Sequence, residues 1–387
     1  MNERQLLMIP GPISFDPAVL RAMSIPTDSH VSAEFIDLFG QALDDMLQVF
    51  LAPHGYPFVV AGSGTLAMEL GLANLVEPGD RVLVLRTGVF GERFSDIARR
   101  QGAEVDEIVA PLGEVPDMAQ VEAKLASAPY KVMAVTHVDT STGVATDVKA
   151  LAALAREHGA LSVVDGVCAT AGMECRQEEW GVDVYLTASQ KAISVPPGLA
   201  LLVASERAIE AFRRRKTLVR SYYADWGKWL PIMEAYRQRK AAYFGTPAVN
   251  LVYALRVSLA QILAEGMDAR FLRHRRLSDG FKAAMAALGL RQVPARSEIA
   301  ATTLTAVYYP DGVGAELLGK IAAEGVVVAG GLHPDIKTRY FRVGHMGPAG
   351  PSDILATVGA IERGLGALGY PVEMGRGVEA AQRAMGI

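Results

Sequence analysis

Cysteine and long apolar segments are both scarce in this sequence. Only two cysteines, Cys168 and Cys175, occur among 387 residues, which argues against a disulfide-stabilised fold and fits a reducing compartment. We expect both to be buried structural thiols. The longest apolar stretches, such as residues 196 to 204, fall well short of the roughly 18 residues that a membrane span needs. The first residues, MNERQLLMIPGP, lack the apolar core of a signal peptide, so we expect a cytoplasmic protein without a membrane partner.

An excess of positive charge is also missing. The chain carries 38 Lys and Arg against 42 Asp and Glu, a formal net charge of −4, which excludes a general nucleic-acid binder. Its histidines form no HExxH motif and no pairing with cysteine at zinc spacing, so no metal site is expected. Hydrophobic residues make up 50% of the chain and charged residues 21%, the composition of a globular protein with a large core.

Short β-branched runs alternate with helix-period segments between about residues 58 and 205. This alternation is typical of βα units around a mostly parallel sheet with helices on both faces. The gap between the last two runs contains Pro196-Pro197-Gly198 and is short for a parallel crossover, so we expect one antiparallel pair. The expected strands are residues 58 to 62, 81 to 85, 132 to 138, 161 to 167, 182 to 189 and 199 to 205.

A second pattern follows Pro247. Two consecutive helices, NLVYALRVSLAQILAEG and DARFLRHRRLSDGFKAAMAALG, lead into strand-like runs that alternate with helices, at residues 304 to 310, 325 to 330 and 340 to 347. We therefore predict an α/β fold in three parts. They are an N-terminal extended segment over residues 1 to 20, a large domain over residues 21 to 250, and a smaller C-terminal α/β domain over residues 251 to 387.

Ser63, Gly64 and Thr65 follow the first expected strand and precede the helix pattern LAMELGLANLV. Hydroxyl groups and free backbone N–H groups at a helix start attract anions, and a glycine lets a phosphate come close. A Ser or Thr before a helix is most often only a cap. The turn lacks the Lys of a P-loop and the third Gly of a dinucleotide fingerprint, so a phosphomonoester fits better than ATP or NAD.

Asp165 and Lys191 lie at the expected carboxyl ends of two further strands, the edge where open α/β sheets bind ligands. Alone, Asp165 could be a loop cap and Lys191 could extend to solvent. An apolar environment would lower the pKa of the lysine and make its amine nucleophilic. An anion site, an Asp and a Lys at one sheet edge are together the groups that hold pyridoxal phosphate.

The chemistry of that cofactor gives each group one task. Lys191 would form a Schiff base with the cofactor aldehyde, Asp165 would keep the pyridine nitrogen protonated, and the helix start would hold the phosphate. Once an amino-acid substrate displaces Lys191, the freed amine is the natural base to move the proton at the substrate α-carbon.

At these residues the chain resembles the class V, fold-type I pyridoxal phosphate aminotransferases, which include alanine-glyoxylate and serine-pyruvate aminotransferases. The resemblance runs through nearly the whole chain, and AGSGTL, THVDTSTGV and WLPIMEAY are most similar to the fungal-type alanine-glyoxylate enzymes. It implies a large domain with a mostly parallel seven-stranded sheet, a smaller C-terminal domain, and a homodimer with active sites at the interface. Further segments that carry it are MIPGP, RTGVFGERF, VVDGVCA, AAYFGTP and YFRVG.

The resemblance also implies further cofactor contacts. Phe90 would stack on the pyridine ring, where the mammalian enzymes have Trp, and Val167 would pack on the opposite face. Thr140 would lie near the phenolic oxygen of the ring and Gln190 near the phosphate. For each of these residues an ordinary core or surface position is the alternative.

Four residues would complete the site by the same resemblance. Tyr243 and Thr246 of the partner subunit would reach the phosphate, Arg342 would hold the substrate α-carboxylate, and Gly11 would line the substrate pocket through its backbone. The alternatives are a buried Tyr243–Phe244 pair, a salt-bridge arginine and a plain extended turn.

The resemblance implies a transaminase that moves the amino group of L-alanine or L-serine to glyoxylate, giving glycine and a 2-oxo acid. Arg342 is the only arginine in a recognisable substrate motif, which favours small substrates. Ureidoglycine, aspartate or an aminophosphonate is the alternative donor within the same fold. Outside it, a nicotinamide-dependent dehydrogenase would not need Lys191, a cysteine desulfurase would need a cysteine on a late loop, and a sensor module would not need the complete site.

Overall fold

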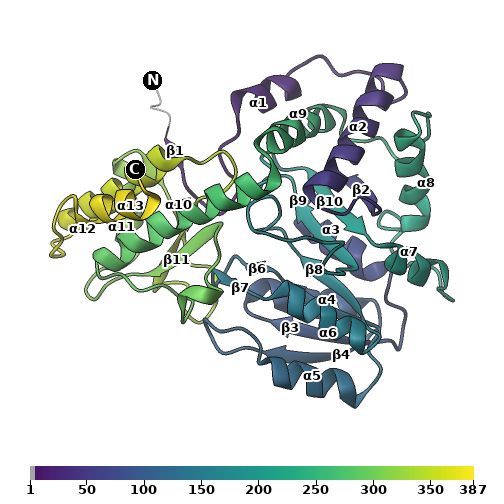
Figure 1. The fold of residues 1–387 in the computed structure, drawn as a ribbon, viewed down its shortest axis with the longest axis horizontal. Coiled ribbons are helices and arrows are strands. Elements are labelled where there is room, and N and C mark those ends of the chain that lie inside the picture. The colour runs from purple at the N-terminus through teal and green to yellow at the C-terminus, as the bar shows by residue number, and fades with distance from the viewer. Residues whose placement is uncertain (1–4) are drawn as a thin grey trace.

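The computed structural model describes residues 5–387, so residues 1 to 4 of the expected N-terminal segment lie outside the described residues. The larger of its two lobes contains a seven-stranded sheet with the order β2-β10-β9-β8-β5-β3-β4 (Figure 1). These strands are β2 (Tyr56–Ala61), β3 (Arg81–Arg86), β4 (Glu104–Val109), β5 (Val132–Thr136), β8 (Leu161–Asp165), β9 (Val184–Ala188) and β10 (Leu199–Ala204).

The sheet is mostly parallel, as predicted. Strands β4, β3, β5, β8 and β9 run parallel to one another, whereas β10 is antiparallel to β9 and also to β2. The expected antiparallel pair is therefore confirmed, and β2 adds a second one. The sequence did not predict β4, because half of its residues EVDEIV are charged and the strand lies at the edge of the sheet, where side chains remain partly exposed.

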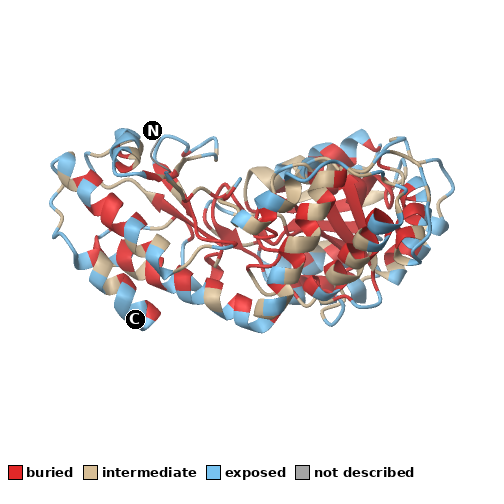
Figure 2. Cartoon of the chain, turned by 90° about the horizontal axis from the view of Figure 1, so that it is seen from above, coloured by how far each residue is buried: buried red, intermediate tan, exposed pale blue. Residues whose placement is uncertain are grey.

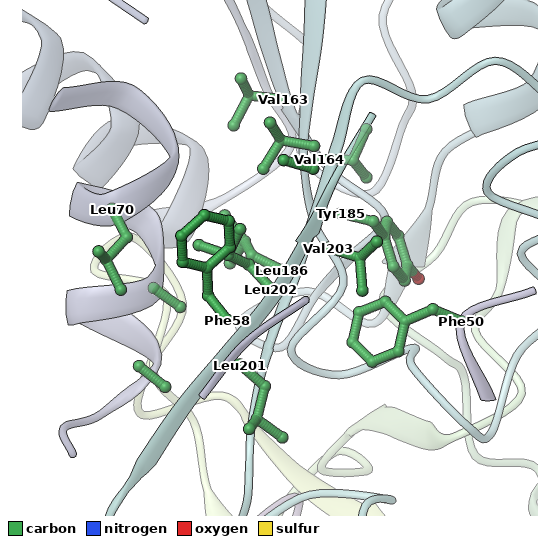
Figure 3. Close-up of a cluster of buried hydrophobic side chains, with 14 of the residues drawn as sticks. Phe50, Phe58, Leu70, Val163, Val164, Tyr185, Leu186, Leu201, Leu202 and Val203 are labelled. Atoms are coloured by element: carbon green, nitrogen blue, oxygen red, sulfur yellow. The ribbon is translucent and has the colours of Figure 1, made fainter. Parts of the chain in front are cut away.

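The central strands are apolar on both faces because helices cover both. Figure 3 shows Leu186 and Leu202 on the side of Leu70 of α3 (Gly64–Ala73), while their neighbours Tyr185 and Val203 point the opposite way, toward Phe50. All of these residues are buried. Such continuous apolar runs are typical of strands in the middle of a parallel sheet, and they explain why these strands were recognisable in the sequence.

Helices surround this sheet and connect its strands. α3 packs against β8, β9 and β10, α4 packs against β3, β4 and β5, and these two helices contact each other. The helices of this part are α1 (Pro17–Met23), α2 (Ala33–Val49), α3 (Gly64–Ala73), α4 (Val89–Arg100), α5 (Met118–Ser127), α6 (Val148–Glu157), α7 (Glu206–Arg213), α8 (Trp226–Arg237) and α9 (Val249–Glu265). A small hairpin of β6 (Val138–Asp139) and β7 (Val144–Ala145) follows β5.

The C-terminal lobe is the smaller α/β unit that the sequence predicted. It has a three-stranded sheet, order β11-β14-β13, and β12 pairs in parallel with β1 of the N-terminal segment. Its strands are β11 (Leu304–Tyr308), β12 (Val326–Val327), β13 (Ala329–Gly330) and β14 (Tyr340–Gly344), with β1 at Leu6–Leu7. Its helices are α10 (Met267–Ala287), η1 (Ser297–Ile299), α11 (Glu316–Ala323), α12 (Pro351–Ala367) and α13 (Arg376–Met385).

The two hydrophobic cores meet along α10, and the domain boundary at residue 251 stays a prediction. α9 packs on α1 and α2, and the hydrophobic core of the large sheet extends to Phe271, whereas the core of the C-terminal lobe takes up α10 from Leu277. Figure 2 shows the buried residues gathered in these two regions, and in Figure 1 α10 runs from one to the other. Both cysteines are buried and free of disulfides, as expected. Within residues 5 to 387, no helix combines the length and the hydropathy that crossing a bilayer requires.

Candidate active site

One cavity of about 160 Å³ brings together all the cofactor residues that were expected to come from a single subunit. They come from the starts of α3 and α4, from the end of β8, and from the segments that follow β6, β8 and β9. The expected residues that line it are Ser63, Gly64, Thr65, Phe90, Thr140, Asp165, Val167, Gln190 and Lys191. The carboxyl edge of the sheet therefore assembles the predicted set, although these residues are far apart in the sequence.

The start of α3 forms one wall of the cavity. Ser63 is the N-cap residue in an extended conformation, but its side chain makes no capping hydrogen bond, so the alternative that it serves as an ordinary cap is not realised. The backbone N–H groups of the first helical turn have no partner within the helix. This terminus can therefore accept an anion.

Asp165 is the last residue of β8 and is only 3% exposed. Its Oδ1 atom accepts a hydrogen bond from the backbone N–H of Val167 at 2.8 Å. Burial raises the pKa of Asp165 to about 7, an effect that Asp139 increases and that Arg93 and Lys191 oppose. A buried carboxylate with so few donors is stabilised by a cationic N–H group, which a protonated pyridine nitrogen can supply.

Lys191 follows β9 and is 9% exposed. Its ammonium group donates a hydrogen bond to the backbone carbonyl of Pro10, so the N-terminal segment contacts this residue of the cavity lining, although Pro10 and Gly11 do not line the cavity themselves. Gly11 lies directly against this lysine, since a Cβ atom at Gly11 would lie 2.6 Å from Lys191 Nζ. The Oε1 atom of neighbouring Gln190 is buried without a hydrogen-bond partner among the described residues, as expected of a group that meets a ligand.

Phe90 and Val167 are the apolar lining on which a flat ring could pack. Phe90 lies in the first turn of α4, and Val167 lies so close to α3 that a Cβ atom at Gly64 would approach its Cγ2 atom to 3.0 Å. Thr140 contributes a buried hydroxyl, 2.7 Å from the Sγ atom of Cys168.

Arg342 lies in β14 and contacts Thr140, a residue of the cavity lining. Its Nε atom donates to the carbonyl of Gly330 at 2.9 Å, and its Nη1 atom donates to the carbonyl of Thr140 at 3.3 Å. Burial lowers the pKa of this guanidinium. Among residues 5–387 it forms an ion pair with no carboxylate, so the salt-bridge alternative is not realised and the group is available to an anionic substrate.

Tyr243 and Thr246 lie on the loop between α8 and α9, away from the cavity lining described above. Tyr243 is 64% exposed, with its ring centroid 5.3 Å from that of His30. Phe244 packs against Trp229 instead. The alternative of a buried Tyr243–Phe244 pair is therefore wrong, while the assignment of Tyr243 and Thr246 to a partner's site stays a prediction.

Three lining residues were not predicted from the sequence: Met68, Arg93 and Val138. Arg93 donates to the Oγ1 atom of Thr65 at 2.7 Å, and its guanidinium lies 4.8 Å from the centroid of the Phe90 ring. The signal was present, because residues three apart on a helix share a face, and Arg93 is three residues after Phe90 in RTGVFGERF. Arg342 is thus not the only arginine near the site.

Comparisons with known proteins agree with this geometry. The family model described as "Aminotransferase class-V" matches residues 20–345. Alanine-glyoxylate aminotransferase 1 of Saccharomyces cerevisiae is 41% identical over 355 residues, 88% of this chain and 91% of the yeast protein. An L-aspartate-glyoxylate aminotransferase of Paracoccus denitrificans is 33% identical over 99% of this chain and 96% of its own length.

The three-dimensional comparison gives the same result. The crystal structure of ureidoglycine-glyoxylate aminotransferase from Bacillus subtilis matches with a TM-score of 0.92 and 28% sequence identity, over 100% of this chain and 99% of that one. The family match, the two relatives and the shared fold all span most of the molecule. The chain therefore belongs to the class V aminotransferase family.

Proposed function

We propose that this enzyme is a pyridoxal phosphate-dependent transaminase that moves the amino group of a small amino acid, L-alanine or L-serine, to glyoxylate. The products would be glycine and a 2-oxo acid. The observation that carries the proposal is the convergence of Lys191, Asp165 and the start of α3 on one cavity. The similarity to the yeast alanine-glyoxylate aminotransferase supports the choice of substrates.

The residues of the cavity fit this cofactor. The free N–H groups at the start of α3 suit a ligand that carries a phosphate, to which the side-chain amide nitrogen of Gln190 would also donate, and the buried carboxylate of Asp165 suits a pyridinium N–H. Phe90 and Val167 would pack on the two faces of the ring, with the Thr140 hydroxyl near its phenolic oxygen. When bound, the cofactor supplies a ring that accepts the electrons released at the substrate α-carbon.

Lys191 is the acid–base residue in this proposal. Lys191 would hold the cofactor, and its amine, once freed by a substrate, would be the base that carries the proton from the substrate α-carbon. The Lys191 side chain is buried, and the Pro10 carbonyl holds its amine beside the cavity.

Arg342 would bind the α-carboxylate shared by every amino-acid donor, and Gly11 would border the pocket through its backbone. Arg93 is a specific reason to consider a second candidate function. A guanidinium in the cavity lining could hold the distal carboxylate of aspartate, and the relative from Paracoccus denitrificans is named for that donor. Ureidoglycine, named for the Bacillus subtilis structure, and an aminophosphonate are the remaining candidate donors.

A panel of amino donors tests the proposal. The protein loaded with pyridoxal phosphate is mixed with each donor, and the loss of the visible absorbance of the lysine-bound cofactor is followed. Each oxo acid is then added to restore it. We expect alanine or serine to react fastest and glyoxylate to restore the band. Reaction with aspartate but not with alanine, serine or glycine would contradict the main proposal and favour aspartate as the donor.

We also propose a homodimer in which Tyr243 and Thr246 complete the phosphate site of the partner subunit. The exposure of the Tyr243 side chain on its loop supports this assignment. Sedimentation in solution tests the dimer. A cytoplasmic location is the remaining proposal, which cell fractionation tests.

A further inference from the structure

Asp139 is a buried carboxylate that none of the expected site roles uses. It lies in β6, within the segment THVDTSTGV, and is 0% exposed. It is not among the described residues that line the cavity, although its neighbours Val138 and Thr140 are. A charge at such a position is costly unless several donors stabilise it, so its partners indicate what it does.

The partners of Asp139 lie at the start of α4. Its Oδ2 atom accepts hydrogen bonds from the backbone N–H groups of Phe90 at 3.0 Å and Gly91 at 3.4 Å. Its Oδ1 atom accepts from the backbone N–H of Ser141 at 2.9 Å and from the Ser141 hydroxyl at 2.5 Å. The Ser141 hydroxyl oxygen in turn accepts from the N–H of Val89 at 3.1 Å. Asp139 and Ser141 therefore hold the first three N–H groups of this helix.

This arrangement replaces an ordinary helix cap. The N-cap residue of α4 is Gly88, which offers no side chain to the free N–H groups. A side chain would not fit there, because a Cβ atom at Gly88 would lie 2.5 Å from Asp139 Oδ1 and closer still to Ser141 Oγ. A negative carboxylate at the positive end of α4 is also electrostatically favourable.

Both oxygens of Asp139 act as acceptors. Backbone N–H groups can only donate, and they reach Oδ1 from Ser141 and Oδ2 from Phe90 and Gly91. Burial raises the pKa of Asp139, and these donors oppose the rise. An Asn at this position could accept at one atom only, so the two contacts cannot both survive that substitution.

The first turn of α4 is also where Phe90 enters the cavity. We propose that Asp139 is a positioning residue that fixes the first turn of α4 and thereby places the Phe90 ring against the cofactor ring. This role of Asp139 rests on the proposed cofactor site. It adds to that site a residue that acts without touching the cofactor.

A double-mutant cycle on the full-length protein tests this role. The dissociation constant of pyridoxal phosphate and the visible circular dichroism of the bound cofactor are measured for the natural protein, Asp139→Asn, Phe90→Leu and the double variant. Loss of a hydrogen-bonded charge predicts about tenfold weaker cofactor binding for Asp139→Asn. If Asp139 acts through Phe90, the double variant binds no more weakly than Phe90→Leu alone, and its dichroism equals that of Phe90→Leu. If the double variant instead shows the product of the two single-variant losses in cofactor affinity, the proposed role of Asp139 is overturned.

Two controls keep the result unambiguous. Asp183→Asn removes another buried carboxylate, which accepts from the backbone N–H of Ser162 at 2.9 Å away from the cavity, and we expect it to leave cofactor affinity unchanged. Should Asp139→Asn fail to fold, Ser141→Ala is combined with Phe90→Leu instead, with a smaller effect but the same non-additivity. If the natural protein binds no cofactor, the proposed function is refuted. If it binds the cofactor but the effects of the two substitutions on binding free energy add, only the role of Asp139 is refuted.

Discussion

The ammonium group of Lys191 donates a hydrogen bond to the backbone carbonyl of Pro10, which lies 181 residues earlier in the chain. The N-terminal segment therefore borders the proposed catalytic amine, while β1 of the same segment pairs with β12 in the C-terminal lobe. The position of the amine thus depends on both lobes. Gly11 is central to this contact, because its φ of +128° and its closeness to Lys191 both exclude a side chain.

We predict that Gly11→Ala lowers transamination by about tenfold to 10²-fold, since displacing a reacting group by about 1 Å costs that much. Its Cβ atom would meet Lys191 Nζ at 2.6 Å and force the amine to move. Steady-state kinetics with alanine and glyoxylate, at saturating cofactor, measures the effect.

Gly159→Ala is the matched control. Gly159 also has a positive φ, +75°, but a Cβ atom at that position would have no neighbouring atom within 4 Å. The variant should lose about 1 kcal/mol of unfolding free energy from backbone strain and keep its kinetics. An equal loss of activity in both variants would show that strain, and not the contact with Lys191, is responsible.

Asp165 should make the stability of the cofactor-free protein depend on pH. Its pKa is about 7 in the folded chain against about 3.9 when unfolded, so the folded state binds more protons between these values. Its contribution to the unfolding free energy is therefore greatest at low pH and declines as pH rises from about 4 to about 7. Asp165→Asn removes this contribution. Denaturant unfolding of both proteins across this window tests it, and a difference that does not change with pH would contradict it.

Arg342→Gln should reduce kcat/KM for the amino donor by roughly 10-fold to 10²-fold, mainly through KM, because a charge-assisted hydrogen bond to a carboxylate is worth about 1.5–3 kcal/mol. Cofactor affinity should stay unchanged. Arg339→Gln, at an exposed position near β14, is the control and should behave like the natural protein. Equal losses in the two variants would argue against Arg342 as the carboxylate site.

Tyr243 should act in the partner's active site, and co-expression of two defective chains tests this. In a mixed dimer of Lys191→Ala and Tyr243→Ala chains, the site that keeps Lys191 would receive an intact Tyr243 from the other chain. We predict that activity at limiting cofactor rises well above that of either variant alone. Without such recovery, Tyr243 serves its own subunit.

Much of the fold and of the cavity followed from local sequence patterns. Buried β-branched runs that end in Asp165 and shortly before Lys191 predicted two central strands and the residues at their ends. Local patterns failed where tertiary packing decides. The charged edge strand β4 resembles a surface segment, and the run at 325 to 330 divides into β12 and β13, which pair with different partners. The contacts of Pro10 with Lys191, and of Asp139 with Phe90, depend on a chain path that no local periodicity encodes.

The most direct test of the central claim is to locate the cofactor on the chain. The protein is loaded with pyridoxal phosphate, reduced with borohydride to make the attachment permanent, digested and analysed by mass spectrometry. We predict that the cofactor mass appears on the peptide containing Lys191 and is absent from a Lys191→Ala variant treated in the same way. Attachment to a different lysine, or no attachment in the natural protein, would contradict the account.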